Sequence, residues 1–210
     1  MSSPPELMYF DGPGRANVAR LAFVLGGVEY VDNRIANWPE VKADQTSVPA
    51  QLFGSLPCLK HGDMILAQSI AIATYAAELG IWKNGSTTES RAQDLMVLCT
   101  NEEMKQSMYK CLFGTDESKE AGRKELDGEV LPKLACLERA LERTEGPFFH
   151  PEGPGLADLA IYDSLHSPFP GLVALGVDLT PFPKIIACAK AVGENPKIKA
   201  FAELGFKHEA

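Results

Sequence analysis

The sequence has few of the features that mark membrane proteins or nucleic-acid-binding proteins. No apolar run approaches the ~20 residues needed to cross a bilayer, and the N-terminus lacks the charged and apolar regions of a secretory signal. Lysine and arginine form no long basic run, and the net charge of −8 disfavours binding to a phosphate backbone. We therefore expect a cytoplasmic protein whose partners include no membrane and no nucleic acid.

Patterns that bind metals or form disulfides are also missing. The five cysteines are widely spaced, with no C-x-x-C pair and no zinc-ligand spacing, so we expect reduced thiols and no metal. Cys58 follows Pro57 directly and is expected to fill a buried strand as a small apolar residue. The histidines share no ligand spacing and no evident base partner, which predicts surface or loop positions for His61, His150, His166 and His208.

The first third of the chain alternates between strand and helix signals. An apolar run at residues 7–10 ends in the turn-forming residues 11–14. Apolar residues at helical spacing follow from Val18 to Leu25, and Gly26-Gly27 closes them as a C-terminal cap. Residues 28–35 mix β-branched and polar side chains, which predicts a second strand and completes a βαβ unit.

A hairpin and a further helix are predicted between residues 52 and 80. The apolar runs 56–59 and 64–66 flank the turn signal Gly62-Asp63, and helical spacing begins at Ser69. Pro57 has no N–H to donate, which suits a strand end or a cis bond that turns the Leu56 backbone outward. A helix beginning at Ser69 presents free backbone N–H groups, which bind anions.

The remainder of the chain is predicted to be helical. Residues 82–88 have no periodicity and contain glycine and serine, which indicates a linker. One apolar helical stripe comprises Leu126, Val130, Leu134, Leu137 and Leu141, with a kink expected at Pro132. We therefore expect two domains, an α/β domain at residues 5–81 and an all-α domain at residues 87–207.

This arrangement resembles the cytosolic glutathione S-transferases. The resemblance rests on the proline before the hairpin, on Gln68-Ser69 at a helix start, and on the order of the two domains. Tyr9-Phe10 followed by Gly14-Arg15-Ala16 is similar to the signature of the sigma-like, tyrosine-type class. The resemblance implies an N-terminal thioredoxin-like domain of order βαβ-ββα and an all-helical C-terminal domain.

The resemblance also implies roles for particular residues. Tyr9 is the expected catalytic hydroxyl, because a hydrogen bond to sulfur stabilises the thiolate of glutathione over its thiol, and Arg15 is expected to support it. The other glutathione-binding residues implied are the Leu56 backbone beside Pro57 for the cysteinyl part, Gln68 and Ser69 for the γ-glutamyl carboxylate, and Trp38 and Lys42 for the glycyl carboxylate.

The implied function is conjugation of glutathione to a hydrophobic electrophile in detoxification. The enzyme would be a homodimer with glutathione as co-substrate and no other cofactor. Two alternatives stay open: a glutathione-dependent isomerase of the prostaglandin D synthase type, and a non-catalytic S-crystallin-like protein.

Three residues depart from the family pattern. Ser55 stands where a longer glutamine or lysine is usual, and Thr100 stands where many relatives carry an aspartate that crosses the dimer. Asn101 and Glu102 are the possible substitutes for that aspartate. Gly155 replaces the hydroxyl residue of a helix-capping box whose other half is Asp158, which predicts a weaker helix start.

Overall fold

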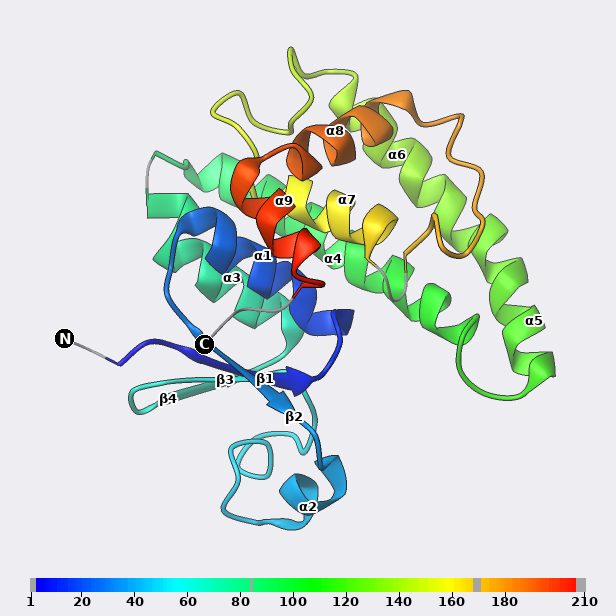
Figure 1. Ribbon diagram of the computed structural model, residues 1–210. Coiled ribbons are helices and arrows are strands. Elements are labelled where there is room, and N and C mark those ends of the chain that lie inside the picture. The colour runs from blue at the N-terminus through cyan, green and yellow to red at the C-terminus, as the bar shows by residue number, and fades with distance from the viewer. Residues whose placement is uncertain (1–2, 84, 168–170, 207–210) are drawn as a thin grey trace. The chain divides into compact units, whose positions relative to one another are not determined.

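The computed structural model of the chain describes residues 3–83, 85–167 and 171–206, which form two compact units (Figure 1). The first unit contains the described residues up to 85 together with residues 196–206, and the second contains residues 86–195. The predicted domains assigned the last segment to the helical half, whereas here it belongs to the first unit. Residue 207, the predicted end of that domain, lies outside the described residues.

The first unit contains the predicted four-stranded sheet. Its strands are β1 (Glu6–Phe10), β2 (Val31–Ile35), β3 (Cys58–His61) and β4 (Met64–Ala67), in the order β2-β1-β3-β4. β1 and β2 are parallel, and the other pairs are antiparallel. β2 begins later than the predicted residue 28, because Gly27 adopts the left-handed conformation and the Val28 N–H still bonds to Phe23 at 2.9 Å.

Helices α1 (Asn17–Gly26) and α3 (Ser69–Leu79) lie side by side on one face of this sheet, and the short α2 (Trp38–Ala43) lies beyond it (Figure 1). A turn of 3-10 helix at Ile81–Lys83 contains the buried Trp82, which was predicted to lie in the linker. Helix α9 (Pro196–Glu203) packs on α1, where Lys197 Nζ donates to the Leu25 carbonyl at 3.1 Å. Contacts of this kind place residues 196–206 with the first unit.

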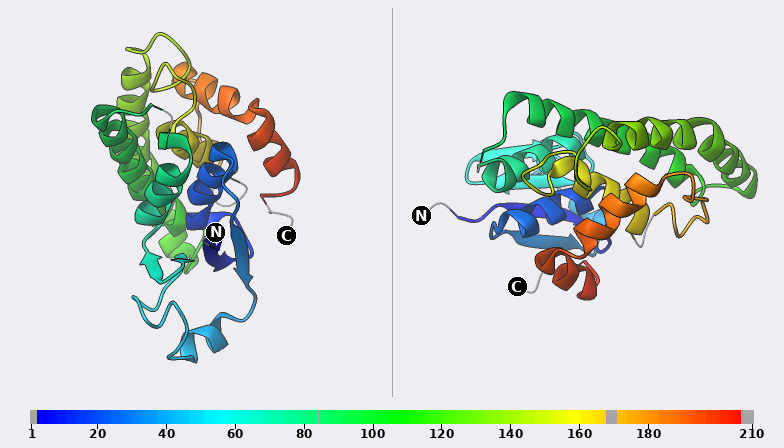
Figure 2. Two further views of the ribbon diagram at one scale, coloured as in Figure 1. Left: turned by 90° about the vertical axis from the view of Figure 1, so that its left-hand side faces the viewer. Right: turned by 90° about the horizontal axis from the view of Figure 1, so that it is seen from above.

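The second unit is all-helical, as predicted. It comprises α4 (Thr88–Lys110), α5 (Asp116–Glu125), α6 (Leu131–Leu141), α7 (Leu156–His166) and α8 (Pro183–Gly193). The predicted apolar stripe is buried along its length, and a π-helical turn at Leu126–Val130 directly precedes the proline-containing start of α6. Figure 2 shows α7 between α4 and α8, and α7 is buried from Leu156 to Leu165. Across the described ranges, no helix combines the length and apolar character needed to span a bilayer.

The start of α7 is held by two carboxylates. Asp158 accepts hydrogen bonds from the N–H groups of Gly155 at 2.8 Å and Phe149 at 3.0 Å. Asp94 of α4 accepts one from Ala157 at 2.9 Å, which takes the place of the missing hydroxyl. A Cβ at position 155 would lie only 3.2 Å from Asp94 Oδ1, so the glycine makes room for this second carboxylate. The helix start is therefore better satisfied than the sequence predicts.

His150 has a partner that the sequence did not reveal. Its Nε2 lies 3.1 Å from Asp94 Oδ1, and the ring is half-buried, so the predicted lack of a base partner is wrong for this residue. His61 is half-buried as well, with Nδ1 lying 2.7 Å from the Tyr75 hydroxyl. His166 is exposed as expected, and His208 lies outside the described residues.

The pairing of His150 predicts a pH-dependent stability. The hydrogen bond that His150 donates to Asp94 raises the pKa of the imidazole, although burial opposes the effect. Its stabilisation is therefore complete below the unfolded pKa of ~6.5 and is lost as the pH rises through the folded pKa. The two side chains are largely buried. We expect His150→Gln to lower the free energy of unfolding, measured by urea denaturation, by about 1 kcal/mol more at about pH 6 than at about pH 8.5, because a hydrogen bond between charged groups is lost. An equal loss at both pH values would contradict an ionic role.

Candidate active site

The register of the sheet brings the predicted site residues to one end of it. Met8 of β1 pairs with Cys58 of β3, and Cys58 pairs with Ala67 of β4. Tyr9 follows Met8, Pro57 precedes Cys58 and Gln68 follows Ala67. Because β3 is antiparallel to its two neighbours, these three residues lie at the same end of the sheet. Parallel pairing of Phe10 with Ile35 brings the start of α2 to this end as well.

Tyr9 is 8% exposed, and its hydroxyl lies against the first turn. The backbone N–H of Arg15 donates a hydrogen bond to the Tyr9 hydroxyl oxygen at 3.1 Å. Gly14 has a φ of 45°, and a Cβ added to it would lie 2.5 Å from the same oxygen. The turn thus fixes the phenol, and the hydroxyl that accepts from Arg15 retains its own proton for donation.

Arg15 lies in a turn of 3-10 helix at Gly14–Ala16, directly before α1. The sequence suggested that its guanidinium supports Tyr9 by charge. The contact found here runs through its backbone instead, so replacement of the side chain leaves this hydrogen bond in place. An electrostatic role for the guanidinium stays a prediction.

The peptide bond between Leu56 and Pro57 is cis, as one of the two predicted arrangements required. β3 begins immediately afterwards, at Cys58. Cys58 is fully buried, its thiol donates to the Ser55 carbonyl at 3.1 Å, and burial raises its pKa to about 11. Such a thiol is a packing group and a poor nucleophile at neutral pH.

Gln68 has a φ of 75° and a ψ of 120°, which a residue with a side chain rarely adopts. Ser69 is the first residue of α3, and the Gln68 carbonyl accepts from the Ile72 N–H at 3.0 Å. The side chain of Gln68 is exposed and that of Ser69 is partly so. Backbone strain of this kind concentrates at ligand sites, where it is maintained because it positions a side chain.

Trp38 and Lys42 lie on α2, four residues apart, so one face of this helix carries both. The Phe10 ring meets the Tyr9 ring edge-on at 5.2 Å and the Trp38 ring at 5.8 Å between centroids. This row of rings connects α2 to the first turn. Lys42 is exposed and free to meet an anion from solvent.

Arg20 is the residue near this site that the sequence reasoning missed. It is fully buried on α1, its Nε donates to Asp32 at 3.0 Å, and its Nη1 donates to the carbonyls of Gly12 at 2.6 Å and Pro13 at 3.2 Å. One feature of the sequence could have identified it: Arg20 is the only charged residue in the otherwise largely apolar α1, and a buried charge needs partners.

The predicted substitutes for the cross-dimer aspartate differ in their surroundings. Asn101 is 1% exposed and its Oδ1 accepts a hydrogen bond from Ser164 of α7. Thr100 is partly exposed, and its hydroxyl donates to the Met96 carbonyl at 2.9 Å. Glu102 is also partly exposed. Asn101 is thus engaged within the second unit and does not suit contact with another subunit.

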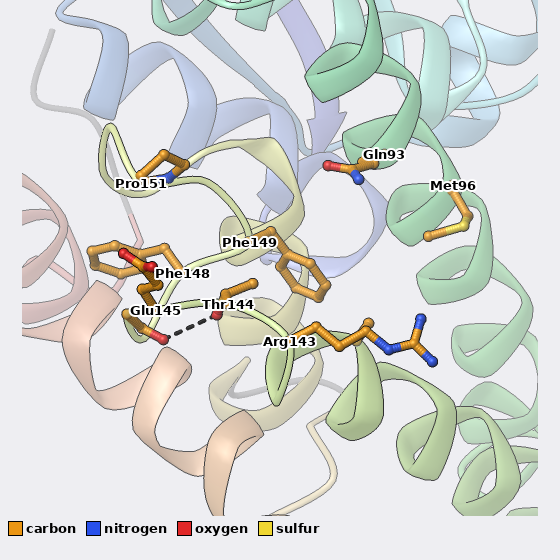
Figure 3. A pocket seen from close by; sticks show the side chains of 10 residues that line it. Gln93, Met96, Arg143, Thr144, Glu145, Phe148, Phe149 and Pro151 are labelled. Carbon is orange, nitrogen blue, oxygen red and sulfur yellow. Dashed lines mark hydrogen bonds between the residues drawn. The ribbon is translucent and has the colours of Figure 1, made fainter.

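A separate cavity of about 500 Å³ lies within the second unit (Figure 3). Its walls come from α4, from the end of α6 and from the segment that follows, with Met96, Arg143, Thr144 and Phe149 among the lining residues. None of the predicted site residues lines it, so the site at the sheet end is independent of this cavity.

The fold comprises a thioredoxin-like unit with a four-stranded sheet followed by a helical unit. Two family models match the chain: the N-terminal domain of glutathione S-transferase at residues 5–78, and the C-terminal domain at residues 102–204. The chain therefore belongs to the glutathione S-transferase family and is a glutathione transferase.

Individual relatives agree with this assignment. The chain is 31% identical over 206 residues to "Probable glutathione S-transferase 5" of Caenorhabditis elegans, covering 94% of this chain and 95% of the relative. It is 28% identical over 203 residues to S-crystallin SL11 of Nototodarus sloanii, covering 93% of each. The crystal structure of a major nematode-specific transferase of C. elegans matches with a TM-score of 0.80 and 28% identity, covering 97% of each chain.

Proposed function

We propose that the protein is a sigma-like, tyrosine-type transferase that activates glutathione with the Tyr9 hydroxyl. The hydrogen bond from the Arg15 N–H to this hydroxyl carries the proposal. A hydroxyl oxygen that already accepts a hydrogen bond is polarised to donate its own proton more strongly. Donation to sulfur favours the thiolate, so it lowers the thiol pKa from its usual ~8.5 and supplies the nucleophile at neutral pH.

Glutathione would lie along the end of the sheet where these residues meet. The strained Gln68 and the exposed start of α3 at Ser69 offer amide, hydroxyl and backbone donors for the γ-glutamyl carboxylate. The Leu56 backbone pairs with the cysteinyl part, and Lys42 beside Trp38 attracts the glycyl carboxylate. These contacts place the sulfur near Tyr9.

The thiolate attacks a hydrophobic electrophile, with no cofactor besides the co-substrate. Glutathione first loses its thiol proton to solvent, and the carbon–sulfur bond then forms as the leaving group departs from the electrophile with the bonding electron pair. We further propose a cytoplasmic homodimer that acts in detoxification, which is the arrangement that the family resemblance implies.

Two other outcomes use the same fold. A glutathione-dependent isomerase would form the same thiolate and release glutathione unchanged. The similarity to S-crystallin SL11 favours, as a second candidate, a protein that keeps the fold without turnover. The hydrogen bond from the Arg15 N–H to the Tyr9 hydroxyl argues for an enzyme, because a protein without turnover does not require a hydroxyl fixed in position to donate to sulfur.

Calorimetric titration with glutathione tests the binding half of the proposal. We expect Ser69→Ala to raise the dissociation constant roughly 10- to 100-fold, because a hydrogen bond to a carboxylate is lost. Ser118→Ala, on the surface of α5, is the matched control and should bind like the wild type. Wild-type protein that does not bind glutathione would overturn the site assignment.

Assays of the wild type against a panel of electrophiles decide among the three activities. Conjugate formed with equal consumption of glutathione supports the transferase. Rearranged product without consumption identifies the isomerase, and binding without any product identifies the non-catalytic protein.

A further inference from the structure

We propose that Arg20 is a positioning residue for the catalytic phenol, holding the turn against which the Tyr9 hydroxyl rests. The inference depends on the proposed role of Tyr9 and adds to it a group that does not touch substrate. All of the groups involved belong to the first unit.

The guanidinium of Arg20 binds the turn that connects β1 to α1. Its Nη1 donates to the carbonyls of Gly12 at 2.6 Å and Pro13 at 3.2 Å. The next two residues along the chain are the two that hold the phenol. Gly14 lies against the Tyr9 hydroxyl, and the Arg15 N–H donates to it. A shift of the carbonyls that Arg20 binds would therefore move both supports of the hydroxyl.

Arg20 also faces the Tyr9 ring itself. Its Cζ is 5.7 Å from the centroid of the Tyr9 ring, within the range of a cation–π interaction. Both groups are buried, so their attraction is little screened by solvent. The cation thus restrains the ring as well as the turn.

The charge of Arg20 is held in place by a shared carboxylate. Asp32 accepts from Arg20 Nε through Oδ1 at 3.0 Å and from Arg34 Nη2 through Oδ2 at 2.8 Å. Arg34 in turn pairs with Asp11 at 3.1 Å, and Asp11 begins the same turn. Burial lowers the pKa of the Arg20 guanidinium, and Asp32 opposes that effect. Asp32 therefore orients both arginines, and these in turn bind the turn between Tyr9 and α1, Arg20 at the Gly12 carbonyl and Arg34 at Asp11.

A double-mutant cycle separates positioning from general stability. We expect Arg20→Met to lower kcat/KM roughly 10- to 100-fold, the size of loss that follows a misplaced catalytic group. In a Tyr9→Phe background the same change should have little further effect, because the group that it positions is already gone. Arg123→Met, on the exposed surface of α5, is the control and should leave kcat/KM unchanged.

The ionisation of bound glutathione gives a readout that loss of stability alone does not move. Thiolate absorbance against pH should show the thiol pKa rising in Arg20→Met toward the free value of ~8.5. Arg20→Lys should shift it less, since it keeps the charge and loses the fork of donors. If the methionine variant fails to fold, the lysine variant carries the same cycle.

The outcomes are distinguishable. Equal losses from the Arg20 change with and without the Tyr9 hydroxyl, or a thiol pKa unchanged in a folded Arg20 variant, would overturn the positioning role. If Tyr9→Phe alone has no effect on turnover, the proposed function fails before Arg20 is considered.

Discussion

Replacement of Tyr9 by phenylalanine is expected to remove most of the turnover while glutathione still binds. Without the hydroxyl, the bound thiol returns toward a pKa of ~8.5, and at about pH 6.5 only about 1% of it is ionised. We therefore expect kcat/KM to fall roughly 100-fold at about pH 6.5, a loss like that of an oxyanion-hole donor. The deficit should shrink as the pH approaches ~8.5, where the thiol ionises unaided.

The control is the same chemical change elsewhere in the first unit. The hydroxyl of Tyr75, on α3, forms a hydrogen bond with His61 Nδ1 at 2.7 Å and lies outside the predicted site. The Tyr75→Phe protein should therefore keep the activity and pH profile of the wild type. Dissociation constants for glutathione should agree within a few-fold among the three proteins, because the proposed carboxylate contacts are untouched. Unchanged turnover in Tyr9→Phe would show that another group activates the sulfur.

The elements of the fold were predictable because their signals are local. The helical spacing from Val18 to Leu25, the Gly26-Gly27 cap and the Gly62-Asp63 turn each act within a few residues. The structure forms α1 and the β3–β4 hairpin at these places. The order of elements along the chain followed from these signals, whereas the order β2-β1-β3-β4 across the sheet was not predicted, since local patterns do not say which strands pair.

Buried polar partners were not predictable, because they join distant parts of the chain. Ala157 and Asp94 meet across a separation of 63 residues, and no pattern near either residue announces the pairing. For the same reason nothing in the sequence indicated that His150 has a partner in Asp94, 56 residues away. The grouping of residues 196–206 with the first unit depends on contacts such as that of Lys197 with Leu25, which helical periodicity does not encode.

The residue types of the candidate site came from the motif, while their geometry came from the structure. The sequence suggested that Arg15 acts through its charge, and the observed contact with Tyr9 uses its backbone. The sequence showed Gly14 as a turn residue and as part of the Gly14-Arg15-Ala16 signature, but only the structure shows that it lies against the Tyr9 hydroxyl. The motif identified Tyr9 and Arg15 as candidate residues, whereas the distances show that backbone atoms of the turn fix the position of the Tyr9 hydroxyl.

Substitution of Gly14 by alanine is expected to disable the phenol without altering any reactive group. The added Cβ would lie 2.5 Å from the Tyr9 hydroxyl oxygen and 2.7 Å from Cε1, so the ring must move. The φ of 45° at this position further disfavours a side chain, at a cost of about 1–2 kcal/mol in stability. We expect kcat/KM to fall at least about tenfold, because a small displacement of a catalytic group has a large kinetic effect.

Gly12→Ala is the matched control, because a Cβ there would meet no atom within 4 Å. It makes the same chemical change two residues away and should keep both the activity and the thiol pKa. Gly14→Ala should raise that pKa while the protein remains folded and binds glutathione. In a Tyr9→Phe background it should cost little further activity, since the hydroxyl that it displaces is absent. A normal thiol pKa in Gly14→Ala would mean that the position of the phenol does not set the ionisation of the sulfur.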